Sequence, residues 1–131
     1  MKFLDGLTEP SYALMRFFGG LFFVQHGTQK LLNFPSEFTY ELNALTLAAG
    51  WIELILGVAI AVGLFTRISA FLCSGMCAVG YWLAHGLGSF FPINNGGELI
   101  ALYCFLFLFI ACRGSGPYSV DAMLFGQKAS A

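Results

Sequence analysis

Four long apolar stretches constrain this chain more than any other feature of its sequence. They cover residues 12–33, 44–65, 67–87 and 96–113, and only a few polar residues interrupt each of them. An α-helix needs about 20 mostly apolar residues to cross the hydrocarbon core of a bilayer. Short, turn-rich segments separate the stretches, and connections of this kind join antiparallel helices. The sequence therefore predicts one all-α domain, a membrane-embedded antiparallel four-helix bundle.

Composition and charge support a lipid environment. Only 10% of the 131 residues are charged and 58% are apolar, whereas about a quarter of the residues in ordinary soluble domains are charged. A net charge of −1 gives no electrostatic reason to expect binding to nucleic acid. We therefore expect the lipid bilayer as a partner and no nucleic acid.

The basic residues predict the orientation of the spans. Five of them fall on the side that would hold both termini and the 63–67 turn: Lys2, Arg16, Arg67, Arg113 and Lys128. The opposite side has Lys30 alone. Under the positive-inside rule this distribution places both termini in the cytoplasm. The segment Ser119–Phe125 is interpreted as a short amphipathic helix on the cytoplasmic surface.

Three ionisable residues fall inside the apolar stretches near one depth. His26 and Lys30 are four residues apart, so they share one helix face. At about 1.5 Å per residue, Glu53 of the second span lies in nearly the same layer as His26. A buried carboxyl is costly in a membrane and usually marks a site. We expect His26 and Glu53 to face each other as catalytic, proton-exchanging residues, the structural alternative being a bridge from Glu53 to His26 or Arg16 that fixes helix register.

Further polar residues cluster toward the same outer side and are predicted to bind substrate, with Lys30 and Glu98 in the same outward-opening polar cavity as His26 and Glu53. They are Lys30, Trp82, His85 and Glu98. Each also has a simpler interpretation. Lys30 could snorkel to the interface, as Arg16 could on the inner side. Glu98 could form a capping box with Asn95, and His85 with Trp82 could belong to an interfacial belt.

The cysteines are interpreted as small apolar residues of the interior. Cys73, Cys77, Cys104 and Cys112 all lie in apolar runs and form no CxxC pair. The alternative is a thiol redox relay. Two histidines and four scattered thiols do not form a recognisable set for haem, flavin or an iron–sulfur cluster. We therefore expect no metal site and no covalent cofactor.

Several segments together resemble the DoxX family of small bacterial membrane proteins. His26–Leu31 is similar to its HGxxKL motif, and further similarity runs through Gly50–Gly57, Gly63–Ala70, Gly97–Leu99 and Gly114–Asp121. The resemblance implies a four-helix, multi-pass protein of the bacterial inner membrane. Some members belong to thiosulfate:quinone oxidoreductases and others to membrane complexes that handle thiol or radical stress, so quinone is the cofactor it suggests.

Three functions follow from these expectations, and the sequence leaves open whether the chain is an enzyme. The first is a quinone-interacting or redox-complex subunit with an intramembrane polar site in the outer half of the bundle. The second is a non-enzymatic scaffold or assembly subunit of a larger complex. The third is a small-anion carrier. Four spans are few for a carrier, and dimerisation through the glycines at 19, 20 and 27 could add helices.

Overall fold

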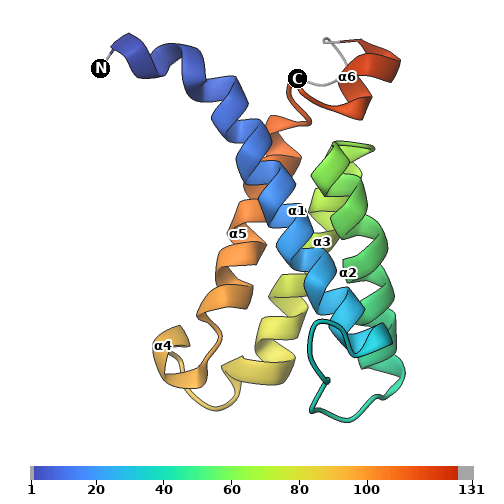
Figure 1. Cartoon of the computed structure of the whole chain (residues 1–131). Helices are drawn as coiled ribbons and strands as arrows, with labels where there is room; N and C mark the ends of the chain where they lie inside the picture. The colour runs from blue at the N-terminus through green and yellow to red at the C-terminus, as the bar shows by residue number, and fades with distance from the viewer. Residues whose placement is uncertain (1, 127–131) are drawn as a thin grey trace.

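The computed structural model describes residues 2–126, and this part of the chain is helical without strands (Figure 1). Four helices are long, and short helical segments flank or connect them. In chain order the elements are the 3₁₀-helix η1 (Lys2–Leu7), α1 (Thr8–Leu32), α2 (Ala44–Val62), α3 (Thr66–Tyr81), the π-helical turn η2 (Trp82–Gly86), α4 (Pro92–Asn95), α5 (Glu98–Arg113) and α6 (Val120–Phe125).

The long helices agree closely with the four apolar stretches, because turn chemistry fixes their ends. Asn43 starts α2 with a capping box: its side chain accepts from the Thr46 amide at 3.0 Å, and the Thr46 hydroxyl accepts from the Asn43 amide at 2.8 Å. Gly63 ends α2 in the left-handed conformation, at φ 76°, which favours glycine. The predicted span 67–87 corresponds to α3 continued by η2.

Two helical segments in the described part of the chain are long and apolar enough to cross a membrane. They are Ala44–Val62, with a mean hydropathy of 2.1, and Thr66–Gly86, with 1.3. Only 28% of the apolar window of each is buried inside the protein. Most of their surface therefore faces outward, which is costly in water and favourable in hydrocarbon.

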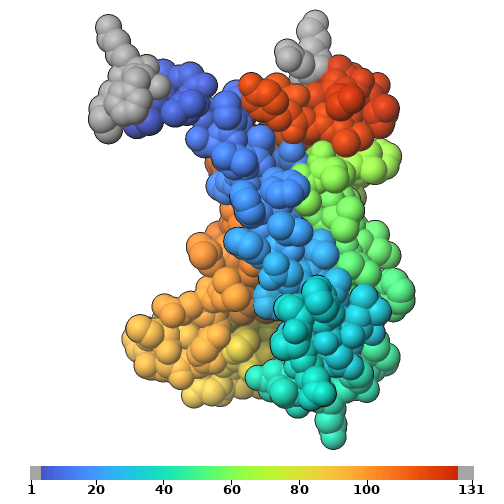
Figure 2. Space-filling view, in the orientation of Figure 1, coloured from blue at the N-terminus to red at the C-terminus, as the bar shows by residue number. Residues whose placement is uncertain are grey.

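Consecutive long helices run up and down alternately (Figure 1). α1 packs extensively on α2 and α3 on α5, while α2 joins the two pairs through α3. One end of the molecule carries η1, α6 and the 63–65 turn, and we call it the terminal end. The other, the loop end, carries the 33–43 segment and α4, and Figure 2 shows the 33–43 segment covering α1 and α2 there.

Glycines bring α1 and α2 into backbone contact. A Cβ atom added to Gly20 would lie 2.6 Å from Ala61 N, and one added to Gly27 would lie 2.6 Å from Leu54 N. Helices that approach this closely need residues without side chains at the crossing. Gly20 and Gly27 are thus occupied within the chain, and Gly19 faces Leu106 of α5. These glycines thus pack inside the chain, and a homo-oligomer that could add helices to a carrier stays a prediction.

Aromatic and sulfur-containing residues fill the core between the helix pairs. The ring centroid of Phe23 lies 4.8 Å from that of Phe107 and 5.4 Å from that of Tyr103. All four cysteines are free thiols, with Cys73 and Cys77 buried in this core and Cys104 half-buried. Cys112 is exposed, so the prediction of an interior position is wrong for that residue. It lies on the outward face of α5.

The interpretation of Arg16 as a snorkelling anchor is wrong. Arg16 is 2% exposed, and its guanidinium donates to three backbone carbonyls. Nη1 bonds Ile60 O and, at 2.8 Å, Ala61 O, and Nη2 bonds Tyr118 O at 2.7 Å. The last carbonyls of a helix have no partner within it, so the end of α2 supplies acceptors for Arg16. The depth of Arg16 along its own span could not reveal these acceptors.

The C-terminal segment forms the expected short helix, but its acid points inward. Asp121 is 9% exposed. Its carboxylate accepts from the amides of Phe65 at 2.7 Å and Thr66 at 2.9 Å, and from the Thr66 hydroxyl at 2.9 Å. Asp121 therefore caps α3 across the terminal end. The exposed apolar residues of α6 are Met123, Leu124 and Phe125.

Candidate functional site

A buried ion pair joins α1 to α2 toward the loop end. Lys30 Nζ lies 2.6 Å from Glu53 Oε1 and 2.5 Å from Oε2. The side chains are 16% and 8% exposed, respectively. On the loop side, Lys30 Nζ also lies 5.8 Å from the centroid of the Phe38 ring, a favourable cation–π position. The ion pair is thus mostly shielded from solvent, by the helices and by the Phe38 ring.

The glycine contact explains why Lys30 is the partner of Glu53. Gly27 meets the α2 backbone at Gly50 and Leu54. Lys30 follows Gly27 by three residues and Glu53 follows Gly50 by three, so each lies close to the crossing face. The structure therefore pairs Glu53 with Lys30, instead of with His26 or Arg16 as predicted. The alternative in which Lys30 snorkels to the interface is wrong as well.

His26 faces α5. It directly precedes Gly27, so its side chain is turned by about 100° around α1 from the α2 contact. Its ring meets that of Tyr103 edge to face, with 6.0 Å between centroids. Within residues 2–126 neither the His26 ring nor the Tyr103 hydroxyl has a hydrogen-bond partner. Two polar groups with free hydrogen-bonding capacity thus lie against the aromatic core.

Tyr103 is not among the site residues predicted from the sequence. It is 7% exposed and stacks on Phe107 with 5.5 Å between ring centroids. A tyrosine in the middle of an apolar span is itself a signal, because a buried hydroxyl usually finds a partner. Its position opposite His26 could not be predicted, since that depends on the rotation of α5.

The remaining predicted substrate-binding residues belong to the loop end. His85 Nδ1 lies 2.9 Å from Asn95 O, and Trp82 is 56% exposed. Glu98 is exposed as the first residue of α5. The capping residue there is Gly97, and the Asn95 side chain bonds Tyr81, Ser89 and Gly97. The proposed Asn95–Glu98 capping box is therefore absent.

The structure brings together Lys30 and Glu53, with His26 on the neighbouring face of α1. In the part of the chain that is described, no hydrogen bond, ion pair or ring contact joins Trp82, His85 or Glu98 to these three residues. A shared substrate cavity stays a prediction. The same part of the chain contains no group of three or more His, Cys, Asp or Glu placed to hold a metal ion.

Chemically, the ion pair combines one acid and one base in a mostly buried position. Buried charges of opposite sign compensate each other, and the removal of one partner leaves the other unpaired at a cost of about 3–5 kcal/mol. An imidazole such as that of His26 carries a nitrogen that can donate a hydrogen bond and one that can accept it. The arrangement therefore suits hydrogen bonding and proton exchange with a small, flat, apolar molecule.

Comparison with known proteins identifies the family of the chain. An uncharacterized protein of Haemophilus influenzae is 39% identical to it over 120 residues, which cover 86% of this chain and 90% of the relative. No solved structure matches it significantly. The model of the DoxX family matches residues 11–86, a range that contains His26, Lys30 and Glu53. The chain therefore belongs to the DoxX family, whose members are membrane-associated.

Proposed function

We propose that the chain is a multi-pass protein of the bacterial inner membrane, a membrane-embedded antiparallel four-helix bundle with cytoplasmic termini. Support comes from the outward-facing apolar surface of α2 and α3, from the alternation of the four long helices, and from the family. The basic residues Arg16, Arg67 and Arg113 lie toward the terminal end, which the positive-inside rule assigns to the cytoplasm.

Within this bundle, the function supported best is that of a quinone-interacting subunit of a redox complex. The observation that carries it is the buried Lys30–Glu53 pair beside His26 and Tyr103, which have no hydrogen-bond partners within residues 2–126. The two carbonyl oxygens of a quinone need hydrogen-bond donors. In this proposal His26 and Tyr103 are the donors, and they lie against the Phe23–Tyr103–Phe107 cluster.

Reduction of a quinone to a quinol takes up two electrons and two protons. In this proposal the electrons come from a redox partner protein. His26 and Glu53 exchange the protons, and Lys30 holds the carboxylate of Glu53 between exchanges. The role of Trp82, His85 and Glu98 in binding a substrate at the loop end stays a prediction.

Binding is tested by melting the detergent-solubilised protein with a short-chain benzoquinone or naphthoquinone. Both quinones should raise the melting temperature of the wild type in a saturable way. Tyr103→Phe and His26→Leu should abolish the rise. Tyr12→Phe is the matched control, because the Tyr12 hydroxyl bonds Gly114 O at the other end of the molecule. No shift in the wild type, or an equal shift in all variants, would overturn the proposal.

The second candidate is a non-enzymatic scaffold or assembly subunit. It is favoured by the ion pair itself, since Lys30 and Glu53 satisfy each other and need no ligand. The double variant Lys30→Met/Glu53→Met separates the two functions. A scaffold should still co-purify with its native-membrane partner after this change, whereas a quinone-dependent activity of the complex should be lost.

A further inference from the structure

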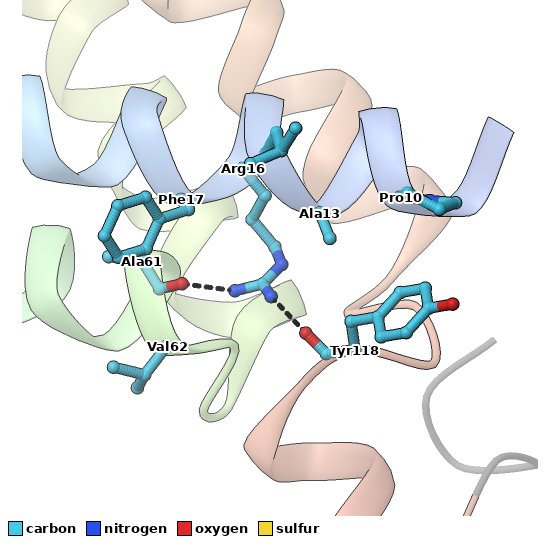
Figure 3. Close-up of a pocket in the computed structure, with 8 residues that line it drawn as sticks. Pro10, Ala13, Arg16, Phe17, Ala61, Val62 and Tyr118 are labelled. Carbon is cyan, nitrogen blue, oxygen red and sulfur yellow. Dashed lines mark hydrogen bonds between the residues drawn. The ribbon is translucent and has the colours of Figure 1, made fainter. Parts of the chain in front are cut away.

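The terminal end carries a hollow of about 520 Å³ between α1, the end of α2 and the segment that precedes α6 (Figure 3). Its size falls within the range of small-molecule sites, about 300–1,000 Å³. Its walls are mostly apolar, and Arg16 is the charged residue that lines it. Its principal lining residues are Ala13, Leu14, Arg16, Phe17, Val62 and Tyr118.

The charge of Arg16 is only partly balanced within the protein. Its three acceptors are backbone carbonyls, and two of them contribute the partial negative charge of about half a unit at the end of α2. In the described structure no carboxylate forms an ion pair with Arg16. The oxygens of Asp121 are bonded to the start of α3, and Glu9 is paired with Arg113. Asp121 acts on the buried charge of Arg16 only through space, and within the described residues no anion is bonded to it.

The guanidinium also has an unused donor. Within residues 2–126, Arg16 Nε is buried and has no hydrogen-bond partner. A buried donor without an acceptor is destabilising, and more so when it is charged. In Figure 3 the two terminal nitrogens are turned to Ala61 and Tyr118, and Nε is on the side of Ala13, a small residue of the hollow. The missing acceptor would therefore come from an occupant of the hollow.

We propose that this hollow binds the phosphate of an anionic membrane lipid, with Arg16 as its anchor. Phosphate oxygens match the planar donors of arginine. The apolar walls Leu14, Phe17 and Val62 are exposed by 58%, 43% and 43%, and they suit the first part of an acyl chain. The inference takes the membrane-embedded bundle as its basis and is independent of the quinone site.

The test uses the purified full-length chain in detergent, incubated with phosphatidylglycerol, phosphatidylcholine or inorganic phosphate. Native mass spectrometry should show one retained phosphatidylglycerol, and its addition should raise the melting temperature saturably. Phosphatidylcholine, whose head carries no net charge, should do neither. Inorganic phosphate should also fail, because it cannot contact the apolar walls.

Arg16 itself is a poor test position, since its loss would break the contacts that hold the terminal end. Leu14→Glu places a negative charge in the hollow and should weaken phosphatidylglycerol binding by roughly tenfold or more, because like charges in a binding site are costly. Leu7→Glu is the matched control: Leu7 lies seven residues earlier, is 48% exposed and is not among the lining residues. It should bind as the wild type does.

Ala13→Phe gives an independent variant that fills the hollow without adding charge, and it should also lose the lipid. Three results would overturn the proposal. These are equal retention of phosphatidylcholine and phosphatidylglycerol, equal effects of Leu14→Glu and Leu7→Glu in correctly folded protein, or stabilisation by inorganic phosphate that matches that of the lipid. The last result would assign the hollow to a soluble anion. None of these measurements depends on quinone binding.

Discussion

Two buried cations connect α1 to α2 by different chemistry. Lys30 meets a carboxylate, whereas Arg16 meets carbonyls at the end of a helix. A lysine amine is a compact point charge that suits a single acid, and the arginine fork can bond several acceptors at once. Two side chains of α1 thus bind α2, and each is of the residue type that fits its acceptors.

The ion pair makes a prediction for single and double variants. Glu53→Ala leaves the Lys30 amine buried without its partner and should destabilise the fold by about 3–5 kcal/mol. Lys30→Met/Glu53→Met removes both charges and should be close to neutral, since apolar replacements of buried pairs often are. Chemical denaturation in detergent measures both changes.

A control for this prediction is Glu98→Ala. Glu98 is exposed and has no ion-pair partner within the described residues, so its loss should change stability little. A double variant as unstable as Glu53→Ala would show that packing of the long side chains, and not their charge, dominates at this position.

The residues of the candidate site were predictable by depth and not by direction. Counting along each helix indicated that Glu53 is buried and that His26 lies in the same layer, because the rise per residue is fixed. Which helix each side chain faces depends on the rotation of the helices. Gly27 and Gly50 set that rotation through their backbone contact. Because of this contact, Glu53 pairs with Lys30 and the His26 side chain faces Tyr103.

At the scale of elements, the α1–α2 crossing brings two helix backbones into direct contact. Gly20, Gly27 and Gly57 would each place an added Cβ atom under 3.0 Å from the opposite helix. Backbone proximity of this kind strengthens dispersion between helices where the hydrophobic effect is absent. Sites on either side of the crossing, Arg16 and Lys30, depend on its geometry.

Gly27→Ala should therefore separate α1 from α2. The added methyl group would lie 2.6 Å from Leu54 N and 2.7 Å from Gly50 O, and backbone atoms cannot yield locally. We expect a loss of about 1–3 kcal/mol from this overpacking. Gly75→Ala is the matched helical control, since no atom lies within 4 Å of its added Cβ atom. It should be neutral or slightly stabilising, by up to about 1 kcal/mol. Equal melting temperatures for the two variants would contradict the close crossing.

The capping of α3 by Asp121 makes a further prediction. Asp121→Ala leaves the amides of Phe65 and Thr66 without their acceptor and should cost roughly 2–3 kcal/mol, since hydrogen bonds to charged groups are strong. Asp5→Ala, an exposed acid at the same end, provides the control and should have little effect. Thermal denaturation followed by circular dichroism measures both. The role of Asp121 was not evident in the sequence, because its partners lie 55 and 56 positions away.

For the whole molecule, the distribution of apolar residues predicts which medium surrounds it. Large exposed hydrophobic residues occur along all four long helices, among them Phe18, Ile55, Phe71 and Phe105. This apolar belt was predictable because span length and composition follow from the sequence alone. The closer pairing of α1 with α2 and of α3 with α5 was not predictable, because it follows from small residues and ring shapes at the contacts.

The orientation gives a prediction for the intact cell. In a background with all four cysteines replaced by alanine, which should still fold, Ser36→Cys and Ser89→Cys should react with an impermeant thiol reagent from the periplasm. Asp5→Cys at the terminal end should react only after the membrane is opened. Ser130→Cys should behave as Asp5→Cys does, although residue 130 lies outside the described residues. Labelling of Asp5→Cys in intact spheroplasts would reverse the assigned topology.

The bonds that close the terminal end also impose an order on biosynthesis. Gly114, Tyr118 and Asp121 supply the partners of Tyr12, Arg16 and Thr66, and they emerge from the ribosome after all four long helices. Until then, Arg16 lacks one of its acceptors and the start of α3 has no cap. The long helices of the nascent protein can form one by one, but the bonds of the terminal end cannot form before residue 121 has left the exit tunnel. An unfinished chain therefore lacks the contacts that hold the terminal end together.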